Sequence, residues 1–329
     1  MSKPRVFVTR LILEKGLNQI RDFCDADVWP EELPPSRQAI LEHVHGVEGL
    51  LCLLTDPIDA GIMDAAGAGL KVISNHAVGV DNVDVAAASV RGIPVGNTPG
   101  ILTDATADMA FALLLASARR LVEGERLVKT GGWKTWGPGF LLGADLAGAT
   151  LGIVGFGRIG RAVARRAGGF GMRIIFTDPA PAYPEPDVAA TQVDFDTLLG
   201  EADFISLHTP LTEETRGLIN ADTLARMKPT AVLVNTSRGP VIDQPALVEA
   251  LRTKRIFAAA LDVTVPEPLP LDHPLLKLDN CLIVPHIASA SWRTRERMSL
   301  MAAENLIAGL KGEKLPNCAN PEVYKKIHE

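Results

Sequence analysis

The chain has 329 residues, of which 47% are hydrophobic and 5% aromatic, and a formal net charge of −6 at pH 7. This length suggests two domains with substantial cores, and the lack of any Lys/Arg-rich run argues against a nucleic-acid partner. We find no signal-peptide core and no apolar stretch of membrane-spanning length. Because the four cysteines are scattered without a C-x-x-C motif, we expect a reduced, cytoplasmic protein with no membrane partner.

The first hundred residues alternate short apolar runs with helical patterns, which predicts an α/β layer with parallel strands. We predict strands at residues 6–9, 49–53, 71–74 and 93–96, and helices at 36–43 and 59–66. A turn signal at residues 97–100 precedes a long helix at 103–120. That helix is apolar almost all round, so we expect it to be buried at a domain or subunit interface.

The hexapeptide GFGRIG at residues 155–160 is the most informative motif. It follows an apolar run at 150–154 and opens a helical pattern at 158–170, and a second apolar run at 173–177 ends in Asp178. This is the layout of a dinucleotide-binding βαβ unit. Gly155 allows the tight turn, Gly157 lets the pyrophosphate approach, and Gly160 lets the helix lie close to the strand. The helix N-terminus offers N–H groups to the phosphates.

Asp178 bears on the choice of cofactor. A carboxylate here can accept hydrogen bonds from the ribose hydroxyls and repels a 2′-phosphate. The next arginine along the chain is Arg216, so NAD(H) is favoured and NADP(H) stays possible. The alternative is that Asp178 only starts the turn before Pro179. The proline-rich residues 180–187 are expected to form a surface loop.

Polar residues follow the strands predicted in the second half, at 203–207, 231–235, 256–261 and 281–284. Helical patterns at 222–227, 243–252 and 292–312 accompany these strands. Arg238, Glu267 and His286 each come after one of them. Ligands of open parallel sheets bind beyond the carboxyl ends of the strands, so the three side chains should meet at the rim that holds the nicotinamide.

These residue types suit the reduction of a 2-keto acid. Hydride addition to a ketone creates an alkoxide that needs a proton, which a histidine can supply near neutral pH. A neighbouring carboxylate orients the ring, and an arginine can clamp the substrate carboxylate. Taken singly, His286 is equally compatible with a structural histidine, Arg238 with a surface arginine, and Glu267 with a loop residue between two prolines.

Other histidines give weaker signals. His43 and His45 form an H-x-H pair that could hold a metal, but only Glu42 lies beside it, and we predict no metal site. His208, in a His-Thr-Pro segment after a strand, is expected to border the cofactor. His76 is compatible with either a structural role or the tuning of substrate fit.

Five segments resemble the signatures of the D-isomer-specific 2-hydroxyacid dehydrogenase family. They are residues 78–82 (VGVDN), 155–160, 235–239 (NTSRG), 261–268 (LDVTVPEP) and 285–287 (PHI). Within the family the chain looks most similar to the glyoxylate/hydroxypyruvate reductase branch, on the stretches 51–56, 131–136, 266–276 and 301–312. The resemblance implies that Arg238 binds substrate, that Glu267 partners His286, and that His286 is the acid/base. It also implies that substrate-binding N–H groups lie at Val78 and Gly79. The expected cofactor contacts are Thr106, Gly155, Phe156, Gly157, Arg158, Ile159, Asp178, His208, Thr209, Pro210, Thr236, Ser237, Arg238, Asp262, His286 and Ala288.

The resemblance further implies a Rossmann nucleotide-binding domain at residues 99–288 and a flavodoxin-like substrate domain at 1–98 and 289–329. Both are doubly wound parallel-sheet domains, with a cleft between them. A homodimer is implied, assembled through the nucleotide domain with an arm at residues 124–145, where Trp133 and Trp136 are dimer or packing contacts. Ala288 replaces a glycine found in many members, and Phe140 replaces a tryptophan found in some reductases.

We therefore expect reduction of glyoxylate or hydroxypyruvate to glycolate or D-glycerate by NAD(P)H. Two alternatives stay open. One is a D-2-hydroxyacid dehydrogenase for another or larger keto acid, such as 2-ketogluconate. The other is an NAD-sensing binding protein similar to the corepressors that resemble this family.

Overall fold

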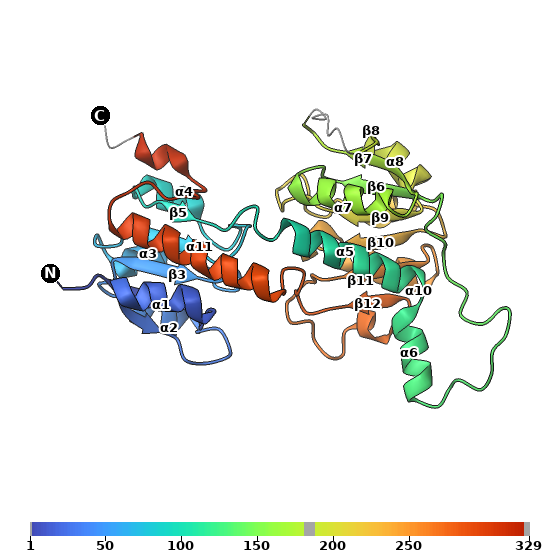
Figure 1. Ribbon diagram of the computed structural model, residues 1–329, viewed down its shortest axis with the longest axis horizontal. Coiled ribbons are helices and arrows are strands. Elements are labelled where there is room, and N and C mark those ends of the chain that lie inside the picture. Colours follow the sequence, from blue (N-terminus) through green and yellow to red (C-terminus); the bar gives the residue numbers. More distant parts are fainter. Residues whose placement is uncertain (1, 181–187, 326–329) are drawn as a thin grey trace. The chain divides into compact units, whose positions relative to one another are not determined.

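The structure is a computed structural model that describes residues 2–180 and 188–325, and it divides into two compact units (Figure 1). Unit 1 comprises Met1–Leu102 and Ala290–Glu329, and unit 2 comprises Thr103–Ser289. The predicted breaks follow residues 98 and 288. Each unit is built on its own parallel sheet, which confirms the predicted class of two α/β domains.

Unit 1 has a five-stranded sheet in the order β2-β1-β3-β4-β5, which is the flavodoxin-like order. Successive side chains of a strand point to opposite faces, so Phe7 enters one core and Val6 and Val8 the other. The elements are β1 (Arg5–Val8), α1 (Glu14–Phe23), β2 (Asp25–Val28), α2 (Arg37–His43), β3 (Gly49–Cys52), α3 (Ala60–Ala66), β4 (Val72–Asn75), α4 (Val85–Val90), β5 (Val95–Gly96), α11 (Trp292–Leu310) and η3 (Pro321–Tyr324).

Two predicted helices of unit 1 begin one residue late for a common reason. Ser36 and Asp59 are N-caps, whose side-chain oxygens accept the N–H groups of Ala39 at 3.2 Å and Ile62 at 3.0 Å. An N-cap has extended backbone, so the helix proper starts after it. Strand β2 was not predicted, because its sequence DADV has no apolar run and its burial is only partial.

Unit 2 has a seven-stranded sheet in the order β12-β11-β10-β9-β6-β7-β8. The strand order reverses between β6 and β9, as in doubly wound Rossmann folds, and this reversal marks the ligand-binding edge. The elements are α5 (Thr103–Ala118), α6 (Leu121–Lys129), β6 (Thr150–Val154), α7 (Arg158–Gly168), β7 (Arg173–Thr177), β8 (Ala190–Gln192), α8 (Phe195–Glu201), β9 (Phe204–Leu207), α9 (Ala221–Leu224), β10 (Val232–Asn235), η1 (Gly239–Val241), α10 (Gln244–Arg252), β11 (Ala258–Leu261), η2 (Pro274–Lys277) and β12 (Cys281–Ile283).

The two faces of this sheet are covered by different helices. Helices α5 and α7 contribute Ala110, Leu114 and Val163 to the core on one face, whereas α8 and α10 contribute Leu198 and Leu247 to the other. Helix α5 is therefore buried largely within its own unit. The predicted surface loop at 180–187 falls almost entirely outside the described residues. Among the helices of the described ranges, none is long and apolar enough to cross a bilayer.

Candidate active site

The glycine fingerprint lies between β6 and α7 and has the geometry that a dinucleotide requires. Gly155 has φ +88°, and a Cβ there would lie 2.7 Å from the carbonyl oxygen of His208. A Cβ at Gly160 would collide with the carbonyl of Gly155, so the helix can start this close to the turn only with glycine. At Gly157, by contrast, a Cβ would meet nothing within 4 Å, which leaves open space where a phosphate would approach.

Asp178 directly follows β7, beside this turn. Its Oδ2 accepts the N–H of Phe156 at 2.6 Å, and its Oδ1 accepts the N–H of Ala180 at 2.8 Å. The carboxylate thus both caps the turn that follows and touches the fingerprint. The ring of Phe156 stacks on Phe176 of β7 with centroids 3.8 Å apart, which holds the turn against that strand.

A buried hydroxyl at the same sheet edge is consistent with a bound cofactor. Thr236 directly follows β10 and is 9% exposed, yet its Oγ1 has no hydrogen-bond partner within the described part of the chain. Such an orphaned group is rare and points to a ligand. Together with the space at Gly157, it indicates that these residues fit a dinucleotide. Of the other expected contacts, Thr106 is buried on α5, Arg158 and Ile159 begin α7, and Thr209 and Pro210 follow β9.

His286 and Glu267 form a hydrogen-bonded pair. The Nδ1 atom of His286 lies 2.8 Å from Oε2 of Glu267, and the N–H of Thr264 donates to Oε1 at 3.0 Å. Their side chains are 25% and 33% exposed, so the pair is accessible without being fully hydrated. Burial alone would raise the pKa of Glu267, but the hydrogen bond and charge of His286, the N–H of Thr264 and the charge of Arg238 together lower it.

The turn that carries His286 is organised by Asp262, the first residue after β11. His286 has φ +53°, a left-handed conformation that is uncommon outside glycine, and its N–H donates to the carbonyl of Asp262 at 2.9 Å. The Asp262 carboxylate accepts the N–H groups of Ile287 at 2.6 Å and Ala288 at 3.0 Å. Burial raises the pKa of Asp262 despite these bonds.

Arg238 comes from the loop after β10, which Asn235 shapes. Asn235 Nδ2 donates to the carbonyl of Arg238 at 2.9 Å, and Asn235 Oδ1 accepts the N–H of Ser237 at 2.9 Å. A Cβ at Gly239 would collide with the backbone of Thr264, so only glycine lets this loop lie against the segment that carries Glu267. Unit 2 therefore brings the loops of Arg238, Glu267 and His286 together at one sheet edge.

Two supporting residues of this edge were missed by reasoning from sequence. Gln244 on α10 accepts the N–H of Val265 at 2.8 Å and donates to its carbonyl at 2.5 Å, which clamps the loop before Glu267. Gln244 and Val265 are 21 positions apart, and no motif in the sequence links them. Asn235 could have been found, because it opens the polar run after its strand.

Neither His208 nor His43 joins this pair. His208 lies 2.8 Å from the Ser206 hydroxyl, and burial lowers the pKa of His208 to about 3, so its imidazole stays neutral. His43 pairs with Asp27 at 2.5 Å. Within the described ranges, no group of three His, Cys, Asp or Glu side chains is placed to hold a metal ion.

In unit 1, the loop after β4 presents backbone N–H groups. The carbonyl of Ala77 accepts the N–H of Thr98 at 2.8 Å, that of Val78 accepts Nδ2 of Asn97 at 2.8 Å, and that of Gly79 accepts Nδ2 of Asn75 at 2.9 Å. The N–H groups of Val78 and Gly79 have no acceptor among the residues that the structure describes. Consecutive backbone N–H groups without an intramolecular acceptor are available to an anion.

Comparisons with known proteins agree with this geometry. Residues 111–288 match the family model described as D-isomer specific 2-hydroxyacid dehydrogenase, NAD binding domain. A glyoxylate reductase of Korarchaeum cryptofilum is 54% identical over 325 residues, which covers 98% of each chain. A Thermus thermophilus protein of known crystal structure has a TM-score of 0.90 at 50% identity and covers 96% of this chain and 99% of its own.

A third relative carries information on ligands. It is the NADPH-dependent glyoxylate/hydroxypyruvate reductase of Sinorhizobium meliloti, whose structure in complex with NADP and malonate has a TM-score of 0.83 at 32% identity. The alignment covers 97% of this chain and 98% of that one. The present chain therefore belongs to the D-isomer specific 2-hydroxyacid dehydrogenase family and is an NAD(P)-dependent dehydrogenase.

Proposed function

We propose that this protein reduces small 2-keto acids, above all glyoxylate and hydroxypyruvate, to glycolate and D-glycerate. The observation that carries the proposal is the 2.8 Å pair of His286 and Glu267 on the sheet edge that also carries Arg238 and the glycine fingerprint. The names of the Korarchaeum and Sinorhizobium relatives support the choice of substrate.

In the proposed reaction, the chain's own residues bind the keto acid and supply a proton. A bound nicotinamide supplies the hydride. Because Nδ1 of His286 is engaged by Glu267, the ring's other nitrogen, Nε2, is the atom that would hold the proton for the forming alkoxide. Glu267 keeps the ring oriented through its hydrogen bond to Nδ1. Arg238 would bind the substrate and polarise its carbonyl oxygen.

We assign the substrate carboxylate to the N–H groups of Val78 and Gly79. The carbonyl oxygens of Ala77, Val78 and Gly79 all accept hydrogen bonds from other residues of unit 1. The N–H groups of Val78 and Gly79 donate to no described residue, which supports this assignment. Two backbone donors recognise a carboxylate without adding charge. A neutral donor set leaves the charge on Arg238 available for the reacting carbonyl.

We also propose a preference for NAD(H), although the Sinorhizobium relative binds NADP. The support is the Asp178 carboxylate, which the N–H groups of Phe156 and Ala180 hold at the end of β7. At that position a carboxylate accepts hydrogen bonds from ribose hydroxyls and repels a 2′-phosphate.

A homodimer is the proposed assembly, in the cytoplasm. The segment after α6 exposes large apolar side chains, with Trp133 at 58% and Trp136 at 78% exposure, and Phe140 and Leu142 are also exposed. Such a patch is typical of a surface that another chain covers. The four cysteines are free, as expected for a reducing compartment.

Steady-state kinetics with glyoxylate, hydroxypyruvate, pyruvate and 2-ketogluconate, each with NADH and NADPH, test these proposals. We expect the highest kcat/KM for one of the first two substrates with NADH. A maximum with 2-ketogluconate would select the alternative of a larger substrate. Binding of NADH without turnover of any of the four would select a cofactor-sensing protein instead.

A further inference from the structure

We propose that Asn82 is a positioning residue for the keto acid, because its side-chain amide ties the loop after β3 to the loop that carries Val78 and Gly79. This inference rests on the proposed function, in which the N–H groups of those two residues bind the substrate carboxylate. Asn82 itself touches no reacting atom; it acts through the backbone that it holds.

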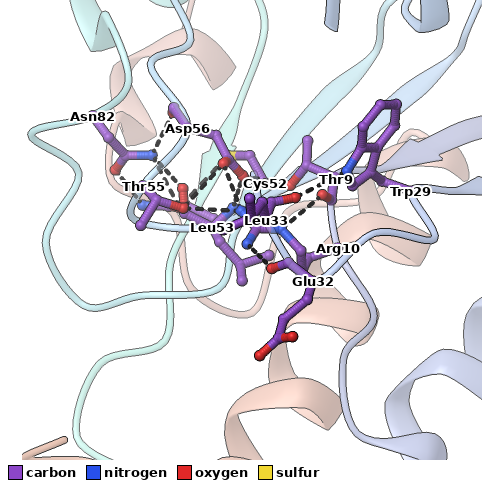
Figure 2. A network of polar contacts seen from close by, with 11 residues as sticks. Thr9, Arg10, Trp29, Glu32, Leu33, Cys52, Leu53, Thr55, Asp56 and Asn82 are labelled. Atoms are coloured by element: carbon purple, nitrogen blue, oxygen red, sulfur yellow. Dashed lines mark hydrogen bonds and ion pairs between the residues drawn. The ribbon is translucent and has the colours of Figure 1, made fainter. Parts of the chain in front are cut away.

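The amide of Asn82 makes contacts in both directions. Its Nδ2 donates to the carbonyl oxygens of Leu53 at 2.9 Å and Asp56 at 3.1 Å, which lie in the loop after β3 (Figure 2). Its Oδ1 accepts Nδ2 of Asn75 at 2.9 Å, and the same Asn75 nitrogen donates to the carbonyl of Gly79 at 2.9 Å. A continuous chain of hydrogen bonds thus runs from the first loop to the proposed anion site.

The loop after β3 is itself anchored by the buried carboxylate of Asp56. This carboxylate accepts the hydroxyl of Thr9 at 2.5 Å and the N–H of Leu53 at 2.8 Å, and it pairs with Arg10 at 3.2 Å (Figure 2). The Asp56 side chain is fully buried and that of Arg10 is 14% exposed, so solvent screens this pair weakly. The Asn82 amide therefore joins the anion-binding loop to a fixed point in the core of unit 1.

This arrangement separates substrate positioning from the hydride-transfer machinery. The fingerprint, His286 and Glu267 all belong to unit 2, whereas the Asn82 contacts lie wholly within unit 1. A backbone N–H group donates to a carboxylate oxygen only within about 2.7–3.2 Å, so a displacement of about 1 Å removes the contact. Loss of the Asn82 amide should therefore weaken keto-acid binding and leave cofactor binding unchanged.

The test compares Asn82→Ala and the isosteric Asn82→Asp with the wild type. Asn82→Asp keeps an oxygen for Asn75 but replaces the donor to Leu53 and Asp56 with an acceptor. For both variants we expect KM for glyoxylate and the Kd of oxamate, a non-reactive analogue, to rise about tenfold or more. The KM for NADH should stay within about twofold.

Asn320→Ala is the matched control, because Asn320 is a buried amide of unit 1 that does not reach the anion site. Its Nδ2 donates to the carbonyl of Ile93, which precedes β5, and its Oδ1 accepts the N–H of Val95, the first residue of β5. We expect this variant to lower Tm and to leave KM for glyoxylate within about twofold.

The outcomes distinguish this inference from the proposed function. Unchanged glyoxylate KM and oxamate Kd in the Asn82 variants would overturn the role of Asn82, and so would equal increases in the Asn320 control. In either case, turnover by the wild type would still support the proposed function. Absence of wild-type turnover would instead refute the function. If Asn82→Ala does not fold, Asp56→Asn is the substitute variant. It keeps the Asn82 contacts but weakens the Asp56 carboxylate's hold on the loop after β3, so KM should rise less than in Asn82→Asp.

Discussion

The two units build binding groups from different parts of the chain. Unit 2 projects side chains, since Arg238, Glu267 and His286 each follow a strand at one sheet edge. Unit 1 instead presents backbone N–H groups at Val78 and Gly79 and uses asparagine amides to hold the surrounding carbonyls. In unit 2, a substitution can remove a reacting group outright. In unit 1, the N–H groups proposed to recognise the substrate survive any substitution except proline, and only their placement can be altered.

This contrast predicts that the two units respond differently to mutation. Changes at His286 or Glu267 should act mainly on kcat, because they remove interactions made in the transition state. Changes around the loop of unit 1 should act mainly on KM. Four experiments test this division.

The first concerns the proton donor. His286→Ala should reduce kcat by about 10²–10⁴-fold, the usual contribution of a positioned acid. Binding of NADH, followed by fluorescence titration, should persist because the glycine fingerprint is untouched. A variant that retained the wild-type kcat would remove His286 from the reaction and end the contrast between the units.

The second concerns the partner of that histidine. Glu267→Gln should lower kcat by about 10–10³-fold, because an amide orients the ring without stabilising its charge. The pKa of Glu267 lies below its usual value of 4.5, so the carboxylate persists as pH falls. In the wild type, any loss of activity due to its protonation should therefore occur below pH 4.5. A pH profile of kcat for both proteins measures this, and a loss centred above that value would contradict the assignment.

The third concerns the cofactor. Asp178→Ser should raise the ratio of kcat/KM with NADPH to that with NADH by about tenfold or more, because it removes the carboxylate that repels a 2′-phosphate. A tenfold change corresponds to roughly 1.4 kcal/mol. The keto-acid KM should not change. A wild-type preference for NADPH would show that the carboxylate does not govern the choice.

The fourth concerns acid stability in unit 1. His76 lies 3.1 Å from the Ser299 hydroxyl, and burial together with the charge of Arg295 lowers the pKa of His76 to about 4. Because the unfolded chain takes up a proton near pH 6.5 and the folded chain does not, stability should fall as pH drops from about 6.5 to 4. Between about pH 7 and about pH 5, His76→Gln should remove about 2 kcal/mol of this decline, since each pH unit below 6.5 corresponds to about 1.4 kcal/mol.

Urea unfolding at about pH 7 and about pH 5 provides the measurement, with the exposed His45→Gln as control. An equal pH dependence in the wild type and in His76→Gln would show that His76 is not the source of the acid sensitivity. A similar reduction in both variants would show that the effect is not specific to the buried histidine.

The parts of this molecule that depend on local sequence could be predicted. Strands β6 and β7 have the predicted bounds, because both are continuous apolar runs on either side of a glycine turn. Strand ends then place Arg238, Glu267 and His286 at one edge, since parallel strands share their carboxyl ends. The run of Ala, Leu and Met at residues 103–120 also predicted the long helix α5, which ends two residues earlier than expected.

The parts that depend on distant contacts could not be predicted. Helix α6 was not predicted, and none of its residues is buried, because its apolar side chains Leu121, Val122 and Val128 are exposed to solvent. The clamp of Gln244 on Val265 and the link from Asn82 to Leu53 join residues that only the fold brings together. A polar side chain that supports a site looks, in sequence, the same as one on the surface.

The exposed indoles of Trp133 and Trp136 have a practical consequence. An indole in water emits at longer wavelength than one that is enclosed, so these two side chains are a built-in optical reporter of whether another chain covers them. Serial dilution of the unlabelled protein, followed by its emission maximum, would record the association constant directly. Trp136→Phe should remove much of that signal without disturbing either sheet.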